Sequence, residues 1–202
     1  MIERRPTRVL DVGCGAGLLG KQLRSLYPEC VCVGVEPDPQ RAALASEHFE
    51  EVLLAPVDSI HALDRLEMLP QFDLIICADV LEHLVDPAAT LRRLASILAP
   101  GGSIITSLPN VRHLSTFVDL YLRGRWPQRE RGIHDKTHLH YFARPNIIEL
   151  GEGAGLVHVV ERRNLRLFEA HSWSMIPAKI LDFWPLRGVY TFQYLHRWVR
   201  RG

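Results

Sequence analysis

The sequence has few cysteines and no long apolar run. Its four cysteines contain no C-x-x-C pair, which disfavours a disulfide framework and predicts reduced thiols. No uncharged apolar stretch reaches the roughly 18 residues of a membrane-spanning helix. The first residues, MIERRPTRVLDVG, have no apolar signal-peptide segment, and the basic residues show no spacing of a known nucleic-acid-binding module. We therefore expect a cytoplasmic protein that binds no nucleic acid.

Charge is distributed unevenly behind a net charge of +1. Residues 1–110 hold 9 Lys or Arg against 15 Asp or Glu, whereas residues 111–202 hold 15 against 8 and seven of the ten histidines. An acidic half suits a ribose or a cation, and a basic half suits an anionic substrate or a membrane surface. A scattered, solvated charge excess would look the same, so both interpretations stay open.

Up to residue 110, short aliphatic and β-branched runs alternate with helical patterns. The patterns predict strands over 8–13, 31–36, 51–55, 72–79 and 103–109, and helices over 18–27, 38–49, 59–67 and 88–99. Beyond residue 110 they predict a helix over 145–155 and two last strands, 156–164 and 165–170, as a hairpin. Such alternation predicts an α/β fold with a seven-stranded, mostly parallel sheet and helices on both faces.

The segment VLDVGCGAGLLG can be divided in two ways. Gly13, Gly15 and Gly17 form G-x-G-x-G, whereas GAGLLG, ending at Gly20, is the G-x-G-x-x-G pattern of dinucleotide-binding loops. Glu36 ends the second expected strand, where a carboxylate accepts ribose hydroxyls in either case. Asp11 favours the first division, because its negative charge would repel a pyrophosphate and attract a sulfonium or ammonium group. Gly20 then lies inside the helix, where close packing suits a small residue.

Four motifs follow one another in the order and spacing of a known family. They are VLDVGCGAG, VGVEPD, FDLIICADVLEHL and LAPGGSII, and the match that contains them covers residues 8–110. This series strongly resembles the class I S-adenosylmethionine-dependent methyltransferases, whose fold is Rossmann-like. DVLEHLVDP, SLPN and GIHDKTHLHYFARPNIIELGEGAGL are similar to a bacterial subgroup linked to envelope glycans, and the core resembles the methyltransferases of ubiquinone biosynthesis.

The resemblance implies S-adenosyl-L-methionine as the cofactor and a set of residues that contact it. Those residues are Asp11, Gly13, Cys14, Gly15, Gly17, Glu36, Pro37, Asp58, Ala78, Asp79 and Val80. Few residues precede the first expected strand, where the family usually has one or two helices that cover the cofactor. The chain is therefore either truncated or closed differently on its substrate side.

Histidines near the carboxyl ends of the fourth and fifth strands are candidates for removing a proton from an acceptor hydroxyl. His83, His113 and His138 are the catalytic candidates, each with a structural alternative, and Glu82 is expected to be structural. His134, His138 and His140 form H-x3-H-x-H, which has enough ligands for a metal. A substrate-lining or structural role is favoured for them, and no metal is expected.

The last residues mix aromatic and basic side chains. Residues 172–202 hold three of the four tryptophans, and we expect a helical tail here, separate from a methyltransferase domain over 1–171 with a substrate-side insertion over 111–144. The tail packs on the domain, contacts the inner face of a membrane peripherally or forms a dimer. The oligomeric state is left open.

Together these patterns predict an S-adenosylmethionine-dependent methyltransferase. Its acceptor would be a hydroxyl on a small molecule, a sugar or a lipid-linked envelope metabolite. The alternatives are an NAD-dependent oxidoreductase or epimerase, for which the sequence lacks Tyr-x-x-x-Lys, and a catalytically silent relative that binds the cofactor.

Overall fold

The computed structural model describes residues 1–166 and 186–201. Its seven strands form one sheet in the order β3-β2-β1-β4-β5-β7-β6. The first five are parallel, and β7 pairs antiparallel with both β5 and β6. The strands are β1 (Arg8–Val12), β2 (Val31–Glu36), β3 (Glu51–Leu54), β4 (Phe72–Ala78), β5 (Leu98–Pro109), β6 (Leu156–Leu165) and β7 (Thr191–Arg200).

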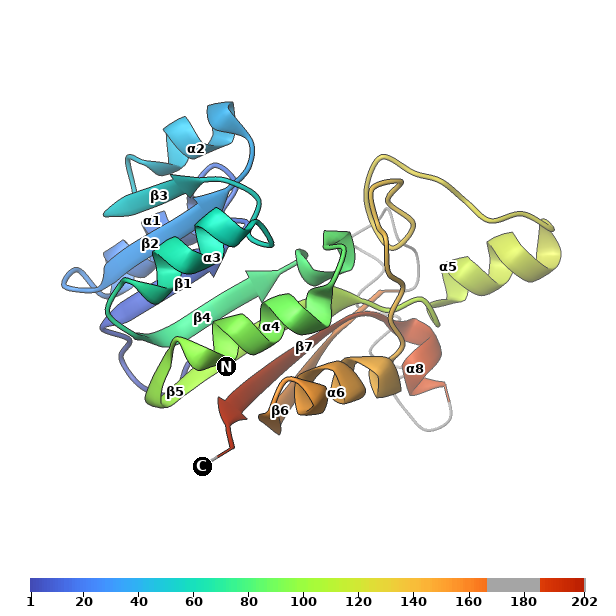
Figure 1. Ribbon diagram of the computed structural model, residues 1–202. Helices are drawn as coiled ribbons and strands as arrows, with labels where there is room; N and C mark the ends of the chain where they lie inside the picture. Colours follow the sequence, from blue (N-terminus) through green and yellow to red (C-terminus); the bar gives the residue numbers. More distant parts are fainter. Residues whose placement is uncertain (167–185, 202) are drawn as a thin grey trace.

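Helices cover both faces of the sheet, with α3, α4 and α6 on the near face of Figure 1 and α1 on the far face. The longer helices are α1 (Leu18–Leu26), α2 (Pro39–Ala45), α3 (Ile60–Glu67), α4 (Pro87–Ser96) and α6 (Arg144–Gly153). The short ones are η1 (Leu81–His83), α5 (Leu114–Phe117), η2 (Val118–Leu122) and α8 (Arg187–Tyr190). The predicted fold class is confirmed.

Local sequence signals explain where the helices begin. The Asp38 carboxylate accepts a hydrogen bond from the Arg41 N–H at 2.9 Å, and the Asp86 carboxylate accepts one from the Ala89 N–H at 2.8 Å. Both aspartates therefore act as the N-caps that their Asp-Pro sequences predict. The helix after Asp86 ends at Ser96, earlier than predicted, because the chain enters β5 at Leu98 and the PGG turn lies within that strand.

Alternating residues of the central strands enter two hydrophobic clusters. Ile75 and Cys77 of β4 belong to one cluster, and Leu74 and Ile76 belong to the other. A parallel strand with both faces covered by helices needs apolar side chains in both directions. The described residues include no helix that is long and apolar enough to cross a membrane.

The prediction of a helical tail is wrong for residues 191–200, which form a strand. This strand is β7, which lies between β5 and β6 and pairs along the length of β6. Most of the strand expected over 165–170 lies outside the described residues. The aromatic side chains of β7 are core residues, with Trp198 1 % and Tyr194 4 % exposed, so they are not available to a membrane. Residues 167–185, which include most of the other expected interfacial side chains, lie outside the described residues.

Candidate functional site

The turn between β1 and α1 is built on glycines. Gly13, Gly15 and Gly17 have φ angles of 70°, 55° and 82°, a left-handed conformation that favours glycine. A Cβ atom on Gly13 would lie 2.6 Å from Cγ2 of Val80, whereas one on Gly15 would meet nothing within 4 Å. The loop therefore packs on the end of β4 at Gly13 and leaves space at Gly15, where a ligand can approach the backbone.

Glu36, the last residue of β2, reaches this loop with its carboxylate. The Gly15 N–H donates to Oε2 at 2.9 Å and the Asp38 N–H donates to Oε1 at 3.1 Å. The residue is only 5 % exposed. These bonds fix two acceptor oxygens beside the space at Gly15, where an acidic residue binds the ribose in related nucleotide-binding folds.

Asp11 adds a second buried acid on the neighbouring strand. Burial, followed by repulsion from the Glu36 carboxylate, raises the pKa of Asp11 to about 7. The residue is 4 % exposed. Two carboxyl groups without a cation are unfavourable in such a position, and a bound sulfonium or ammonium group would relieve both effects.

Cys14 and Gly20 face the core. The Cys14 Sγ atom lies 2.7 Å from the position that a Cβ on Gly34 would take, so only the backbone of Cys14 is available to a ligand. A Cβ on Gly20 would lie 2.3 Å from the ring of Phe49. Gly20 therefore serves helix packing, as expected, and the G-x-G-x-G division describes the loop.

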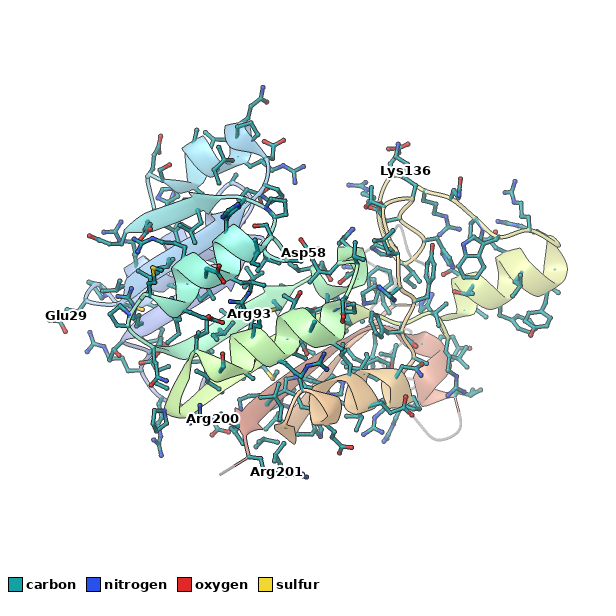
Figure 2. The ribbon with its side chains drawn as sticks, in the orientation of Figure 1. Glu29, Asp58, Arg93, Lys136, Arg200 and Arg201 are labelled. Carbon is teal, nitrogen blue, oxygen red and sulfur yellow. The ribbon has the colours of Figure 1, made fainter. Side chains whose placement is uncertain are left out.

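The carboxyl end of β4 borders the same space. Ala78 and Asp79 are exposed and Val80 is half-buried. Asp79 has a φ of 56°, and its carboxylate accepts a hydrogen bond from the Gln193 side chain of β7. Gln193 could not be predicted from the sequence, because only the folded sheet brings it close to Asp79. Pro37 is exposed, and half-buried Asp58 lies at the same edge of the sheet in Figure 2.

Glu82, expected from the sequence to be structural, has an unusual environment. It is 1 % exposed, and neither carboxylate oxygen has a hydrogen-bond partner among the residues that the structure describes. Burial is the main cause that raises its pKa to about 8. Its Oε1 lies 3.9 Å from Nε2 of His138. An uncompensated buried carboxyl group of this kind is a mark of functional sites.

His83 and His138 face each other beside Glu82. Their ring centroids are 4.7 Å apart in an edge-to-face arrangement. His138 Nδ1 lies 3.0 Å from the Ile133 carbonyl, which accepts its hydrogen, so the lone pair is on Nε2. His83 Nδ1 pairs with the Thr137 hydroxyl at 3.0 Å. Ligand atoms of these two histidines and Glu82 lie within 4.8 Å of one another, so the trio could also hold a metal ion.

His113 has a different role from the one predicted. The Ser115 N–H donates to Nδ1 at 3.2 Å, so Nε2 carries the hydrogen and donates it to the Arg166 carbonyl at 2.8 Å. The ring is fully buried, and it caps the start of α5. With both nitrogens engaged, the geometry argues against His113 as a base.

The other two histidines of H-x3-H-x-H contact partners of their own. His134 is buried beside the Thr116 hydroxyl at 3.0 Å, and burial lowers its pKa to about 4. His140 Nε2 lies 3.3 Å from the Val85 carbonyl. Of the three, only His138 belongs to a possible metal-binding group within the described residues.

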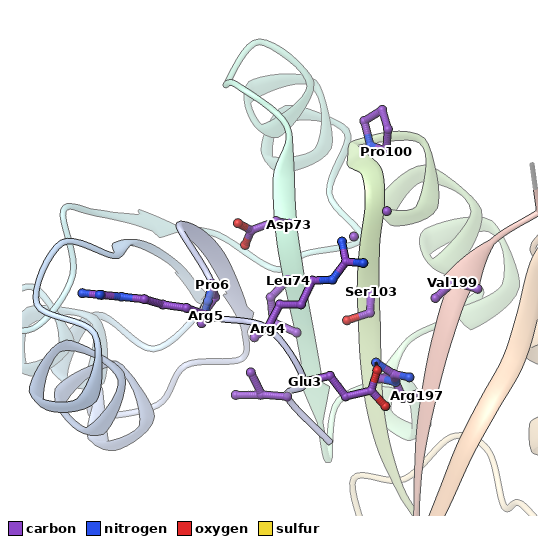
Figure 3. A pocket seen from close by; sticks show the side chains of 13 residues that line it. Glu3, Arg4, Arg5, Pro6, Asp73, Leu74, Pro100, Ser103, Arg197 and Val199 are labelled. Atoms are coloured by element: carbon purple, nitrogen blue, oxygen red, sulfur yellow. Dashed lines mark ion pairs between the residues drawn. The ribbon is translucent and has the colours of Figure 1, made fainter.

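A pocket of about 350 Å³ opens at the other end of the central strands, opposite the glycine loop. Residues 2–6, the start of β4 and Arg197 are among those that line it, and Figure 3 shows the Glu3–Arg197 ion pair, 2.6 Å long, on its wall. Open α/β sheets bind ligands at the carboxyl ends of their strands. This pocket lies at the amino ends of β4 and β5, so it is not the candidate cofactor site.

The chain is similar in sequence to known methyltransferases. Residues 2–161 match a family described as "Methyltransferase domain". The chain belongs to this family. It is 31% identical over 170 residues to a ubiquinone biosynthesis O-methyltransferase of Cereibacter sphaeroides, covering 83% of this chain and 66% of that protein. The corresponding enzyme of Aeromonas salmonicida is 28% identical over 156 residues, covering 74% and 63%.

Solved structures of methyltransferases share the fold. The N-methyltransferase NodS of Bradyrhizobium japonicum, in complex with S-adenosyl-L-homocysteine, aligns with a TM-score of 0.58 at 17% identity over 98% of this chain and 79% of that one. A possible histamine N-methyltransferase of Thermotoga maritima aligns at 0.63 and 18% identity, over 96% and 82%. The predicted family, fold and cofactor are confirmed. This methyltransferase-family chain spans about half to two thirds of the length of the curated relatives it matches.

Proposed function

We propose that this chain transfers a methyl group from S-adenosylmethionine to a hydroxyl group of a small molecule, a sugar or a lipid-linked envelope metabolite. The observation that carries the proposal is the Glu36 carboxylate, buried and fixed at the glycine loop by two backbone N–H groups. A hydroxyl acceptor is supported by the O-methyltransferase names of the curated relatives.

The geometry of the loop and of the strand ends around it supports an assignment of the donor's binding residues. Glu36 would accept the ribose hydroxyls, and the loop from Gly13 to Gly17 would contact the methionine part beside Asp11. Asp58 and residues 78–80 would border the adenine or the methionine. The bound cofactor supplies an electrophilic methyl group on a sulfonium centre. The chain's own task is to align the acceptor and to exclude water.

His138 has the properties of a general base. Its Nδ1–H is held by the Ile133 carbonyl, which leaves Nε2 to accept a proton. Burial lowers its pKa, so the ring is neutral at pH 7. Glu82, whose pKa is raised to about 8, lies 3.9 Å from Nε2, and its carboxylate would stabilise the imidazolium when it ionises, which favours turnover above pH 8. His83, edge-on to His138, would line the acceptor pocket or share the proton.

The insertion over 111–144 remains the expected acceptor side. It exposes apolar side chains, with Phe117 50 %, Tyr121 72 % and Leu122 70 % exposed. These residues lie on α5 and η2, which project from the sheet in Figure 1. Exposed aromatic and aliphatic side chains favour an acceptor with an apolar part over a free sugar.

Calorimetry separates this proposal from the alternatives. We expect S-adenosylhomocysteine to bind with micromolar affinity and NADH to give no heat; the reverse result would support an oxidoreductase. A catalytically silent relative would bind S-adenosylhomocysteine yet consume no donor across a panel of sugar, lipid-linked and quinol acceptors. Genomic neighbours can guide the choice of that panel.

A chelator tests whether the trio of Glu82, His83 and His138 acts through a proton or a metal. If His138 is the base, donor turnover survives chelator treatment and falls in a His138→Gln variant. If turnover disappears with the chelator and returns with added divalent metal, a metal ion held by the same three residues has the catalytic role instead of His138.

A further inference from the structure

A β-bulge in β6 brings together three side chains far from the glycine loop. His158 lies opposite Trp198 and Glu161 lies opposite His196, with a register shift between His158 and Val160. Residues three apart in a regular strand point to opposite faces. The extra residue of the bulge places His158 and Glu161 on one face together with His196, and bulges commonly re-aim side chains near functional sites.

His196 is buried with its polar atoms unsatisfied. The residue is 0 % exposed, and among the described residues neither of its ring nitrogens, nor Nε2 of His158, has a hydrogen-bond partner. The two ring centroids are 4.8 Å apart, and His196 Nε2 lies 3.9 Å from Glu161 Oε2. Each buried polar group without a partner costs about 1–3 kcal/mol. The two rings and the Glu161 carboxylate therefore bring three potential ligand atoms within 4.8 Å of one another.

We propose that His158, Glu161 and His196 bind a divalent transition-metal ion such as Zn²⁺. Two imidazole nitrogens and one carboxylate oxygen suit Zn²⁺, whereas Mg²⁺ favours oxygen ligands alone. A water molecule would be the fourth ligand of the Zn²⁺ ion. The three ligand atoms already lie within 4.8 Å of one another. Bonds of about 2.0–2.2 Å at tetrahedral angles need separations of about 3.4 Å, so small side-chain rotations close the site.

Neighbouring side chains orient two of the proposed ligands. The Arg144 Nε–H donates to Glu161 Oε2 at 2.6 Å, which orients the carboxylate as outer partners of metal ligands do. The Arg144 charge also lowers the affinity for a cation, so moderate binding is expected. The His196 ring stacks on Trp198 with centroids 5.3 Å apart.

The position of the site separates it from the glycine loop. β6 is an edge strand whose partner is β7, and the metal would join these two strands at the end of the sheet away from β2 and Glu36. The Glu161 side chain is 20% exposed and His158 is half-buried, so an ion can enter from solvent without unfolding the strands.

Titration of the metal-free chain with Co²⁺ tests the proposal, because tetrahedral Co²⁺ gives visible absorption. His158→Gln removes one proposed ligand, and His61→Gln, at an exposed histidine of α3 outside both possible metal groups, is the matched control. We expect His158→Gln to lose one equivalent of Co²⁺, and the Tm increase caused by Zn²⁺, while His61→Gln keeps both.

Two results would overturn the proposal: wild-type protein that binds no Co²⁺ or Zn²⁺ at about 100 μM, or His158→Gln with the same stoichiometry and affinity as wild type. Circular dichroism checks that the variants fold. Glu161→Gln, which keeps an oxygen that can accept the Arg144 hydrogen bond, replaces His158→Gln if that variant does not fold, and the same loss is expected.

Discussion

Cofactor affinity should depend on pH through Asp11. Its pKa is raised to about 7 by burial and by Glu36, so the carboxyl is about 10% ionised at about pH 6 and about 90% ionised at about pH 8. If the ionised form binds the cation of the donor, affinity increases about tenfold across this interval. In the unliganded chain the same raised pKa lowers folding stability as pH rises from 3.8 through about 7, and a bound cation reverses that loss.

Isothermal titration calorimetry at several pH values measures the effect. S-adenosylmethionine carries both a sulfonium and an ammonium group, whereas S-adenosylhomocysteine carries only the ammonium. A pH dependence common to both ligands would assign Asp11 to the ammonium, and one confined to the donor would assign it to the sulfonium.

Two variants separate Asp11 from other groups. Asp11→Asn keeps the shape of the side chain and should flatten the profile. Glu82→Gln, which removes a carboxyl whose pKa is raised to about 8, should leave the profile unchanged. A wild-type profile that is flat, or an Asp11→Asn profile as steep as that of wild type, would refute the assignment.

Four further outcomes are expected. Glu36→Gln should weaken S-adenosylhomocysteine binding by about 1–3 kcal/mol, roughly 5- to 150-fold by calorimetry; unchanged affinity would contradict the ribose assignment. Gly20→Ala should lower the free energy of unfolding by about 1–3 kcal/mol, because its Cβ would overlap the Phe49 ring, and Phe49→Leu should recover part of this in a double-mutant cycle. His138→Gln should reduce kcat about 10²- to 10⁴-fold without changing cofactor affinity; equal turnover would exclude it as the base. Trp198→Phe should cost about 1–3 kcal/mol in urea unfolding, since Nε1–H donates to the buried Thr106 hydroxyl at 2.9 Å.

Features encoded by neighbouring residues could be predicted from the sequence. The glycine turn, Glu36 at the end of its strand and the Asp-Pro helix starts are written in a few consecutive positions. The packing role of Gly20 also follows from its place within a helix. Such local signals were sufficient for the family, the cofactor and most of the sheet.

Features that depend on distant pairing could not be predicted in the same way. The segment 191–200 mixes aromatic and basic residues, and only its insertion between β5 and β6 explains why the aromatics are buried. Glu82 resembles any acid in a helical turn until His138, 56 positions later in the sequence, is placed beside it. His113 resembled a base because its two backbone partners, one of them at Arg166, are not visible in a motif.

The placement of β7 imposes an order on biosynthesis. Among the described strands β7 comes last in the sequence, yet it occupies an interior position between two strands made earlier. Until it emerges, the nascent chain has an open edge on β5 and a separate β6, with unpaired backbone groups that invite association with other chains. The sheet can therefore be completed only after synthesis of β7, through long-range contacts that form slowly. A chain that stalls before β7 would contain the whole glycine loop and leave β6 without the strand that joins it to the sheet.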